Sequence, residues 1–400
     1  MTINNMLKFS RFTYLDNNAT TRVSDTVFDA MRDYLGIQLG NPSSNTSIGR
    51  RAKNAIEVAR KQVANSIGAT DKQIYFTSCG SESNSWAITS CIQSQLNSLK
   101  KTIITSPVEH DSVREHLNHL STLGYNVHQL PVMKNGEVDF SDLQNIDVND
   151  VLFASIMLVN NELGTINNLD CLKQFRDSVP AGTEKFPIHC DAIQALGKIK
   201  ISVSDLDVDY LSISGHKIHA PKGVGALYAK SGQALTPMIW GHQENNLRGG
   251  TENVAFIVGF GQAVADAYGK GKDGSSFDDR IKAIQTMRDY IEKEISSSID
   301  ITVINGFSQN RVSNTTNLGF RGLDAIKLSL LLEQRGIFVS NGAACNIINP
   351  KQSHVLAAIQ SETYNDGAIR ISLSCRNTQL DCEYFVINLK NIISKIKGGN

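Results

Sequence analysis

The sequence predicts an α/β protein with a large domain built on a mostly parallel sheet covered by helices, followed by a smaller α/β domain. Short, almost wholly apolar runs alternate with segments whose apolar residues recur every three or four positions. Strands that helices cover on both faces read as continuous apolar runs, so this alternation is typical of a mostly parallel sheet. A stretch rich in Gly and Lys, residues 268–276, separates a second group of segments. We therefore expect a large domain over 15–268 and a small domain over 1–14 and 269–400.

The elements expected in the large domain follow from these two periodicities. Apolar runs predict strands, and apolar residues spaced by three and four predict helices. In chain order, the strands are expected at 74–77, 102–105, 151–159, 186–190, 210–214 and 225–228, and the helices at 50–66, 82–98, 112–123 and 169–178.

After residue 276 the same criteria predict a shorter set of elements. A long amphipathic helix is expected first, then two strands, a second helix and a basic C-terminal helix. These lie at 277–296, 301–304, 314–319, 324–334 and 383–397. The smaller α/β domain is built from them.

Composition limits the partners and the compartment of the protein. The 400 residues hold 39 basic and 39 acidic side chains, so no net charge favours nucleic acid. No apolar run approaches the roughly 18 residues that a membrane span requires, and the N-terminus lacks a signal-peptide pattern. The seven cysteines are scattered and form no C-x-x-C pair, which indicates reduced thiols and no metal site. We expect a cytoplasmic protein that contacts neither membrane nor nucleic acid directly.

Small residues follow the expected strand at 74–77, where a helix begins. Cys79, Gly80 and Ser81 would let backbone N–H groups approach a phosphate, and the helix dipole favours its negative charge. An ordinary helix-capping turn is the other interpretation of this stretch.

Two further polar clusters follow expected strands. Asp191 and Gln194 come after one strand, and Ser214, His216 and Lys217 come after another. A carboxylate at a strand end can keep a pyridinium nitrogen protonated, although such an Asp is often only a helix cap. A lysine placed there can form a Schiff base, and burial would favour the neutral amine that this needs. A lysine that reaches solvent or a carboxylate is the ordinary alternative.

The order of motifs along nearly the whole chain resembles the class V aminotransferase superfamily of fold-type I enzymes that use pyridoxal 5'-phosphate (PLP). The resemblance is closest to cysteine desulfurases of the NifS/IscS type. Besides the clusters at Asp191 and Lys217, it rests on residues 14–21, 40–44, 105–110, 159–164, 247–253, 340–345 and 368–373. It implies a homodimer that takes L-cysteine as substrate and passes sulfur to an acceptor protein.

The resemblance also implies a role for individual residues. Lys217 would hold the cofactor and move protons, Asp191 would pair with the ring nitrogen, and Gln194 would bond the ring oxygen. His110 would stack on the ring and assist proton transfer. The cofactor phosphate would be bound by Gly80, Ser81, Ser214 and His216, with Thr251 reaching in from the second subunit, and the substrate carboxylate by Asn161 and Arg370.

Cys345 is the residue that would distinguish a desulfurase from other members of the superfamily. It follows Gly342, Ala343 and Ala344, small residues typical of a mobile loop, where a buried inert cysteine is the ordinary alternative. The resemblance implies that its thiolate attacks the substrate sulfur, which leaves a persulfide on Cys345 and alanine as product. A selenocysteine lyase or another class V lyase or transaminase would need no such nucleophile, and a silent sulfur relay would not need the catalytic set.

The chain departs from the family pattern at several positions. Ser47, Asn167 and Arg22 replace residues common in the family, and the residues around Cys345 lack the usual Ser and Thr. We expect these changes to affect the partner or the mobility of the loop rather than the chemistry. The acceptor stays open among iron–sulfur cluster assembly, tRNA thiolation and a dedicated pathway such as DNA phosphorothioation.

Overall fold

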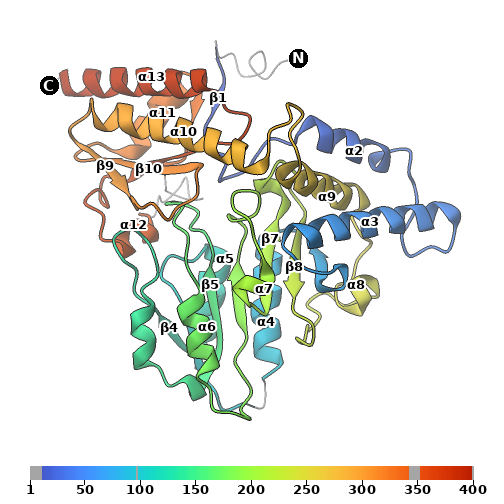
Figure 1. Ribbon diagram of the computed structural model, residues 1–400. Coiled ribbons are helices and arrows are strands. Elements are labelled where there is room, and N and C mark those ends of the chain that lie inside the picture. Colours follow the sequence, from blue (N-terminus) through green and yellow to red (C-terminus); the bar gives the residue numbers. More distant parts are fainter. Residues whose placement is uncertain (1–10, 96–97, 342–351, 399–400) are drawn as a thin grey trace.

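The computed structural model describes residues 11–95, 98–341 and 352–398, and its largest element is a seven-stranded sheet (Figure 1). The strand order across this sheet is β2-β8-β7-β6-β5-β3-β4. Its strands are β2 (Ile74–Thr77), β3 (Thr102–Thr105), β4 (Asn126–Gln129), β5 (Val151–Met157), β6 (Ile188–Asp191), β7 (Tyr210–Ser214) and β8 (Gly225–Ala229).

The direction of these strands brings their carboxyl ends together. The pairs from β4 through β3, β5 and β6 to β7 are parallel, whereas β8 runs antiparallel to both β7 and β2. Strand β2 therefore runs in the same direction as β7. Thr77, Thr105, Met157, Asp191 and Ser214, which end their strands, consequently lie at one edge of the sheet. Ligands in open α/β sheets bind beyond this edge.

Helices cover both faces of the sheet, and alternate residues of the strands face each layer. In β8, for example, Leu227 packs with one apolar cluster while Ala226 and Tyr228 pack with the other. The covering helices are α2 (Asp25–Leu35), α3 (Ser47–Ser66), α4 (Gly80–Gln93), α5 (Asp111–Thr122), α6 (Asp170–Asp177), α7 (Val203–Leu206), α8 (Gln243–Asn246) and α9 (Val254–Tyr268). This layering explains why the strands are apolar on both faces.

The C-terminal part forms a second layer of helices on a small antiparallel sheet, drawn at the top of Figure 1. The sheet order is β12-β10-β9, and strand β1 of the N-terminal segment pairs in parallel with β11. A separate apolar core lies between these elements and includes Leu15, Ile291 and Phe385. The elements are β1 (Thr13–Tyr14), β9 (Thr302–Asn305), β10 (Thr315–Phe320), β11 (Ile337–Phe338), β12 (Ala368–Ser372), α10 (Phe277–Ser296), α11 (Ala325–Glu333), α12 (His354–Ala358) and α13 (Gln379–Gly398).

The predicted fold class is confirmed: a large, mostly parallel sheet is covered by helices and is followed by a smaller α/β part. The bounds of β2, β3, β7 and α10 match the expected ones. Helix α4 ends earlier than expected, at Gln93, and β5 ends at Met157 rather than at residue 159. The antiparallel direction of β8 is not visible in its sequence. In the described part of the chain, no helix combines the length and apolar character needed to cross a bilayer.

Candidate active site

The turn between β2 and α4 offers backbone donors beside a buried hydroxyl. Cys79, the N-cap of α4, makes no side-chain capping bond, and Gly80 begins the helix. A Cβ on Gly80 would lie 2.2 Å from Ile193 Cδ1 and 3.4 Å from Ser214 Cβ, so a larger residue here would require Ile193 to move. Ser214 Oγ is buried and has no hydrogen-bond partner among the described residues. The N-terminal dipole of α4 and this unused hydroxyl suit an anion such as a phosphate.

Asp191 and His110 belong to one chain of hydrogen bonds. Asp191, the last residue of β6, accepts from Asn84 Nδ2 at 2.8 Å and from the Ile193 backbone N–H at 2.9 Å. Asn84 Nδ2 also donates to Ser112 Oγ at 2.9 Å, and that oxygen lies 2.9 Å from His110 Nδ1. His110 is the N-cap of α5. A carboxylate held from β6 and an imidazole held from α5 are thus positioned through Asn84.

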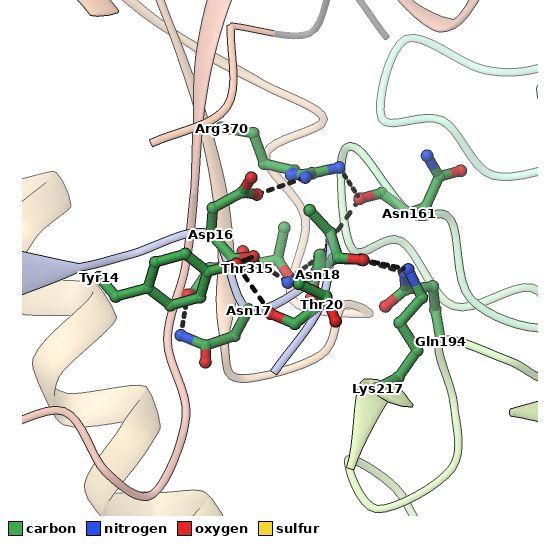
Figure 2. A network of polar contacts seen from close by, with 12 residues as sticks. Tyr14, Asp16, Asn17, Asn18, Thr20, Asn161, Gln194, Lys217, Thr315 and Arg370 are labelled. Atoms are coloured by element: carbon green, nitrogen blue, oxygen red, sulfur yellow. Dashed lines mark hydrogen bonds and ion pairs between the residues drawn. The ribbon is translucent and has the colours of Figure 1, made fainter. Parts of the chain in front are cut away.

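Lys217 and Gln194 meet at the backbone of the N-terminal segment (Figure 2). Lys217 Nζ donates to the carbonyl oxygens of Asn18 at 2.6 Å and Ala19 at 2.9 Å. Gln194 Nε2 donates to the same Asn18 oxygen at 3.0 Å. Two side chains that follow different strands of the sheet therefore share one acceptor from residues 14–21.

His216 lies next to Lys217 and is held as a neutral imidazole. Burial, reinforced by the charges of Lys217 and Lys222, lowers the pKa of His216 to about 4. Its Nδ1 lies 3.2 Å from Thr20 Oγ1. The residue can accept or donate a hydrogen bond at neutral pH without adding a charge beside the lysine.

Arg370 on β12 approaches the site from the smaller sheet (Figure 2). Its Nη2 lies 2.6 Å from Asp16 Oδ1 and its Nη1 donates to the Asn161 carbonyl oxygen at 3.0 Å. Its Nε is buried and has no hydrogen-bond partner in the described part of the chain. Asn18 Nδ2 donates to the same Asn161 oxygen at 3.2 Å. Asn18 therefore links the guanidinium side of the site to the lysine side.

Two expected residues are not joined to this network. Thr251 is exposed, and no hydrogen bond or ion pair found among the described residues connects it to the others. Cys345 lies outside the described residues, so its position relative to the network is not part of the structure. Within the described ranges, no group of three or more His, Cys, Asp or Glu side chains is arranged to hold a metal ion.

Two buried carboxyl groups border the site. Burial, with a smaller contribution from Asp191, raises the pKa of Glu109 to about 8, although Ser106 Oγ and the Met157 N–H both donate to it. Burial likewise raises the pKa of Glu162, whose Oε2 accepts from Ser353 Oγ at 2.6 Å. Glu109 is consequently protonated over much of the neutral range.

A cavity of about 710 Å³ opens between the N-terminal segment, α10 and the residues after β12. Lys198 and Lys217 are part of its lining, together with Asn314 and Leu373. Asp191 and His110 are not. Lys217 therefore belongs both to the wall of this cavity and to the group of residues at the strand ends.

Sequence reasoning missed the side chains that connect the expected ones. Asp16 and Asn18 lie inside the motif at 14–21, yet no role was assigned to them. Asn84 is three residues beyond Ser81, and Lys198 is four residues beyond Gln194. Their polarity next to apolar strands was the available signal, but their partners lie far away in the chain.

The arrangement fits PLP. Gly80 and the unused Ser214 hydroxyl can hold its phosphate, Asp191 can pair with a protonated ring nitrogen, and the Lys217 amine can take its aldehyde. His110 is held from α5 near the Asp191 side of the site.

The comparisons with known proteins agree with this arrangement. "Cysteine desulfurase IscS" of Dictyoglomus turgidum is 40% identical over 97% of this chain and 96% of its own length. "Cysteine desulfurase NifS" of Azotobacter vinelandii is 37% identical over 96% of this chain and 93% of its own. A solved "NIFS-like protein" superposes with a TM-score of 0.87 at 34% identity, covering 96% of this chain and all 100% of that one. A structure of "SspA in complex with cysteine" gives 0.77 at 31% identity, over 92% of this chain and 100% of the other.

The family model described as "Aminotransferase class-V" matches residues 13–385. This match spans nearly the whole chain and includes both the strand-end residues and Arg370. The chain belongs to the aminotransferase class-V family, whose cysteine desulfurases depend on PLP.

Proposed function

We propose that this protein is a PLP-dependent cysteine desulfurase that converts L-cysteine to L-alanine and leaves the sulfur as a persulfide on Cys345. Relatives that carry the name cysteine desulfurase are 36% to 40% identical over almost the whole chain. The observation that carries the proposal is the hydrogen-bonded network from Lys217 through Asn18 and Asn161 to Arg370. It connects a cofactor-binding amine with a carboxylate-binding guanidinium, as an amino-acid substrate requires.

The residues of the chain divide the work between binding and proton transfer. Bound PLP supplies an electron sink for the substrate Cα. Arg370 binds the substrate carboxylate through its planar fork, with Asn161 beside it. Asp191 would keep a proton on the ring nitrogen of the cofactor. The Lys217 amine would carry a proton to and from the substrate Cα. His110 would assist proton transfer, and His216, whose imidazole stays neutral, would help to hold the cofactor phosphate without adding a charge beside Lys217.

Sulfur transfer falls to Cys345 in this proposal. Its thiolate attacks the substrate sulfur, so that a new S–S bond forms as the substrate C–S bond breaks. The bonding electrons stay with the substrate carbon, which is then protonated to give alanine. The products are L-alanine and one Cys345 persulfide, so no external oxidant is consumed. The persulfide sulfur then passes to the thiol of an acceptor protein.

The chain is proposed to act as a homodimer. Ile37, Leu39 and Trp240 expose 79%, 80% and 80% of their surface. Leu39 lines a surface hollow together with Glu252 and Asn253, next to Thr251. Ile37 and Leu39 lie two residues apart in the chain, and we take them as part of a surface that a second copy covers. A second copy that covers them would bring the Thr251 loop of one subunit toward the phosphate-binding turn of the other.

The remaining proposals concern organisation and location. Separate apolar cores support a large domain over 15–268 and a small domain over 1–14 and 269–400, although Leu15 packs with the small core. A Cys345 nucleophile needs a reducing compartment, which supports a cytoplasmic location. The acceptor is proposed to be a protein, in iron–sulfur cluster assembly, tRNA thiolation or a dedicated pathway such as DNA phosphorothioation.

The test is alanine and sulfide release from L-cysteine with a reductant, for wild type, Lys217→Ala and Cys345→Ala. Wild type alone is expected to release both products, and only Lys217→Ala is expected to lose the yellow colour of the linked cofactor. Wild-type rates in Cys345→Ala would contradict the persulfide step and favour a lyase. Absence of alanine from PLP-loaded wild type would contradict the desulfurase itself.

A further inference from the structure

Lys198 is a second buried lysine in the site, and neither the motifs nor the relatives assign it a role here. Only 8% of its surface is exposed, and no ion pair joins it to a carboxylate in the described part of the chain. Its Nζ instead contacts two amide oxygens, Asn18 Oδ1 at 2.8 Å and Gln194 Oε1. A lysine that is buried without a counter-ion is rare, because desolvation disfavours its charge. Such a costly arrangement calls for a specific role.

The two amides that Lys198 touches are the ones that connect the site. Gln194 directs its NH₂ group at the Asn18 carbonyl oxygen, which also accepts from Lys217. Asn18 directs its NH₂ group at Thr315 Oγ1, 2.9 Å away, and at the Asn161 oxygen to which Arg370 donates. The oxygen of each amide thus contacts Lys198, and the Asn18 oxygen accepts in addition from Asn314 Nδ2 at 3.1 Å. The nitrogen of each amide faces a group of the active site.

An amide side chain can be turned end for end with little change of shape, and only its hydrogen-bond partners decide which end faces which way. A lysine head group offers hydrogens to both oxygens whether or not it is charged. Burial, the charge of Lys217 and the charge of Arg370 lower the pKa of Lys198. The two contacts persist in a neutral amine, which still carries two hydrogens for two oxygens.

We propose that Lys198 is a positioning residue that fixes the orientation of the Gln194 and Asn18 amides, so that Gln194 presents its NH₂ group to the active site. The consequence for Gln194 rests on the proposed function, in which that NH₂ group bonds the ring oxygen of PLP. Asn18 contacts Lys217 through its backbone oxygen and the Asn161 oxygen, to which Arg370 donates, through its side-chain NH₂ group. A fixed Asn18 amide would therefore also keep the separation of Lys217 and Arg370 constant. Lys198 touches neither substrate nor cofactor in this account and acts through the two amides.

A double-mutant cycle tests the proposal on the PLP-loaded enzyme. Lys198→Met keeps the length of the apolar stem and removes the donors, Gln194→Ala removes the amide, and the third protein carries both changes. Lys200→Met is the matched control, because this lysine is exposed and its contacts, with Asp278 and the Phe277 ring, lie at the surface. The readouts are the absorption maximum of the bound cofactor, and kcat and KM for L-cysteine.

Lys198→Met and Gln194→Ala are expected to shift the absorption maximum in the same direction and to lower kcat/KM roughly tenfold each. The double variant is expected to lie within about twofold of Gln194→Ala, because residues acting through one contact are not additive. Lys200→Met is expected to match wild type. A Lys198→Met spectrum identical to wild type, or effects that multiply in the double variant, would overturn the proposal.

The role of Lys198 can still be tested if a variant does not fold or if the wild type is inactive. If Lys198→Met does not fold, the same cycle with Lys198→Leu carries the test, since its shorter apolar side chain also lacks hydrogen-bond donors. If wild type binds PLP but makes no alanine, the proposed function fails, while the absorption cycle still decides the role of Lys198.

Discussion

Among the residues that the structure describes, the guanidinium of Arg370 makes one ion pair, with Asp16, and one hydrogen bond, with the Asn161 carbonyl. An arginine that binds a substrate carboxylate could be expected to have no acidic partner before the substrate arrives. Here the side-chain carboxylate of Asp16 already neutralises the charge of Arg370. Burying an unpaired guanidinium would cost several kcal/mol, which explains why Asp16 stays close. In the proposed function, the substrate carboxylate would therefore displace Asp16 or share the guanidinium with it, and Nε, which has no hydrogen-bond partner among the described residues, would be available to bind it.

Glu109 gives the clearest pH prediction at the residue scale. Its pKa is about 8 in the folded protein, against an ordinary value near 4.5. Below about pH 4.5 the Glu109 carboxyl is protonated in both the folded and the unfolded protein, so it does not change the free energy of unfolding. Between about pH 4.5 and about pH 8 only the unfolded chain releases it, so the free energy of unfolding falls by up to about 1.4 kcal/mol per pH unit. Glu109→Gln removes this dependence, and its stability relative to wild type is expected to rise over that range.

Urea unfolding of the PLP-loaded proteins at several pH values measures this difference. Glu333→Gln, which changes an exposed glutamate at the end of α11, is the control and is expected to follow wild type. A constant difference between Glu109→Gln and wild type from about pH 5 to about pH 8 would show that the Glu109 carboxyl ionises normally in the folded state.

At the scale of elements, the junction of β2 and α4 depends on a glycine. A Cβ at position 80 would lie 2.2 Å from Ile193 Cδ1, so either Ile193 or the turn itself would have to shift. Gly80→Ala is expected to weaken PLP binding about tenfold, which corresponds to about 1.4 kcal/mol, because the helix N-terminus and the Ser214 hydroxyl would move apart. Gly398→Ala, where a Cβ meets nothing, is the control.

Equilibrium titration of the cofactor-free proteins with PLP checks this expectation, with the thermal midpoint recorded for each. Equal affinity of Gly80→Ala and wild type would mean that this turn does not hold the phosphate. A lowered midpoint with unchanged affinity would assign Gly80 to packing alone.

Some elements could be predicted from the sequence and others could not, for physical reasons. Apolar strands such as β3 and β7 are recognisable because both of their faces are buried. Helix α9 escaped prediction because it is apolar around most of its circumference and contains Gly259 and Gly261. A Cβ on Gly259 would lie 2.5 Å from Met31 Sδ, and a Cβ on Gly261 would lie 2.7 Å from the Ala59 backbone. Close helix packing, and not local propensity, keeps them there. Edge strand β4 is polar and half-exposed, so it lacks the apolar signal.

The site shows the same division. Asp191, Gln194 and Lys217 could be placed at strand ends because parallel strands share one edge. The central position of Asn18 in the network could not be predicted, because its hydrogen-bond partners lie far away in the sequence. They include Gln194, Lys198, Asn314 and Ser372. Those contacts depend on how the C-terminal part, with its three-stranded sheet, packs against the large sheet. Local pattern carries no information about that.

At the scale of the whole molecule, the exposed apolar surface predicts the oligomeric state. Ile37→Asp combined with Leu39→Asp is expected to convert the proposed dimer to monomers, because charges on this surface oppose its burial. Sedimentation velocity measures the change, and the exposed Leu380→Asp on α13 is the matched control. Activity is expected to fall with dimer content if Thr251 acts across the interface. A dimer that persists in the double variant would place the interface elsewhere.

The persulfide on Cys345 is the central claim, and a single turnover tests it most directly. PLP-loaded protein is mixed with one equivalent of L-cysteine per subunit and no other thiol, because excess cysteine would itself reduce the persulfide. Alanine is counted per subunit, and the mass of the Cys345 peptide is measured by mass spectrometry. The account predicts one alanine per subunit and a mass gain of one sulfur atom on that peptide, both absent in Cys345→Ala. Alanine formation with no added sulfur on Cys345, or with the sulfur on another cysteine, would contradict it.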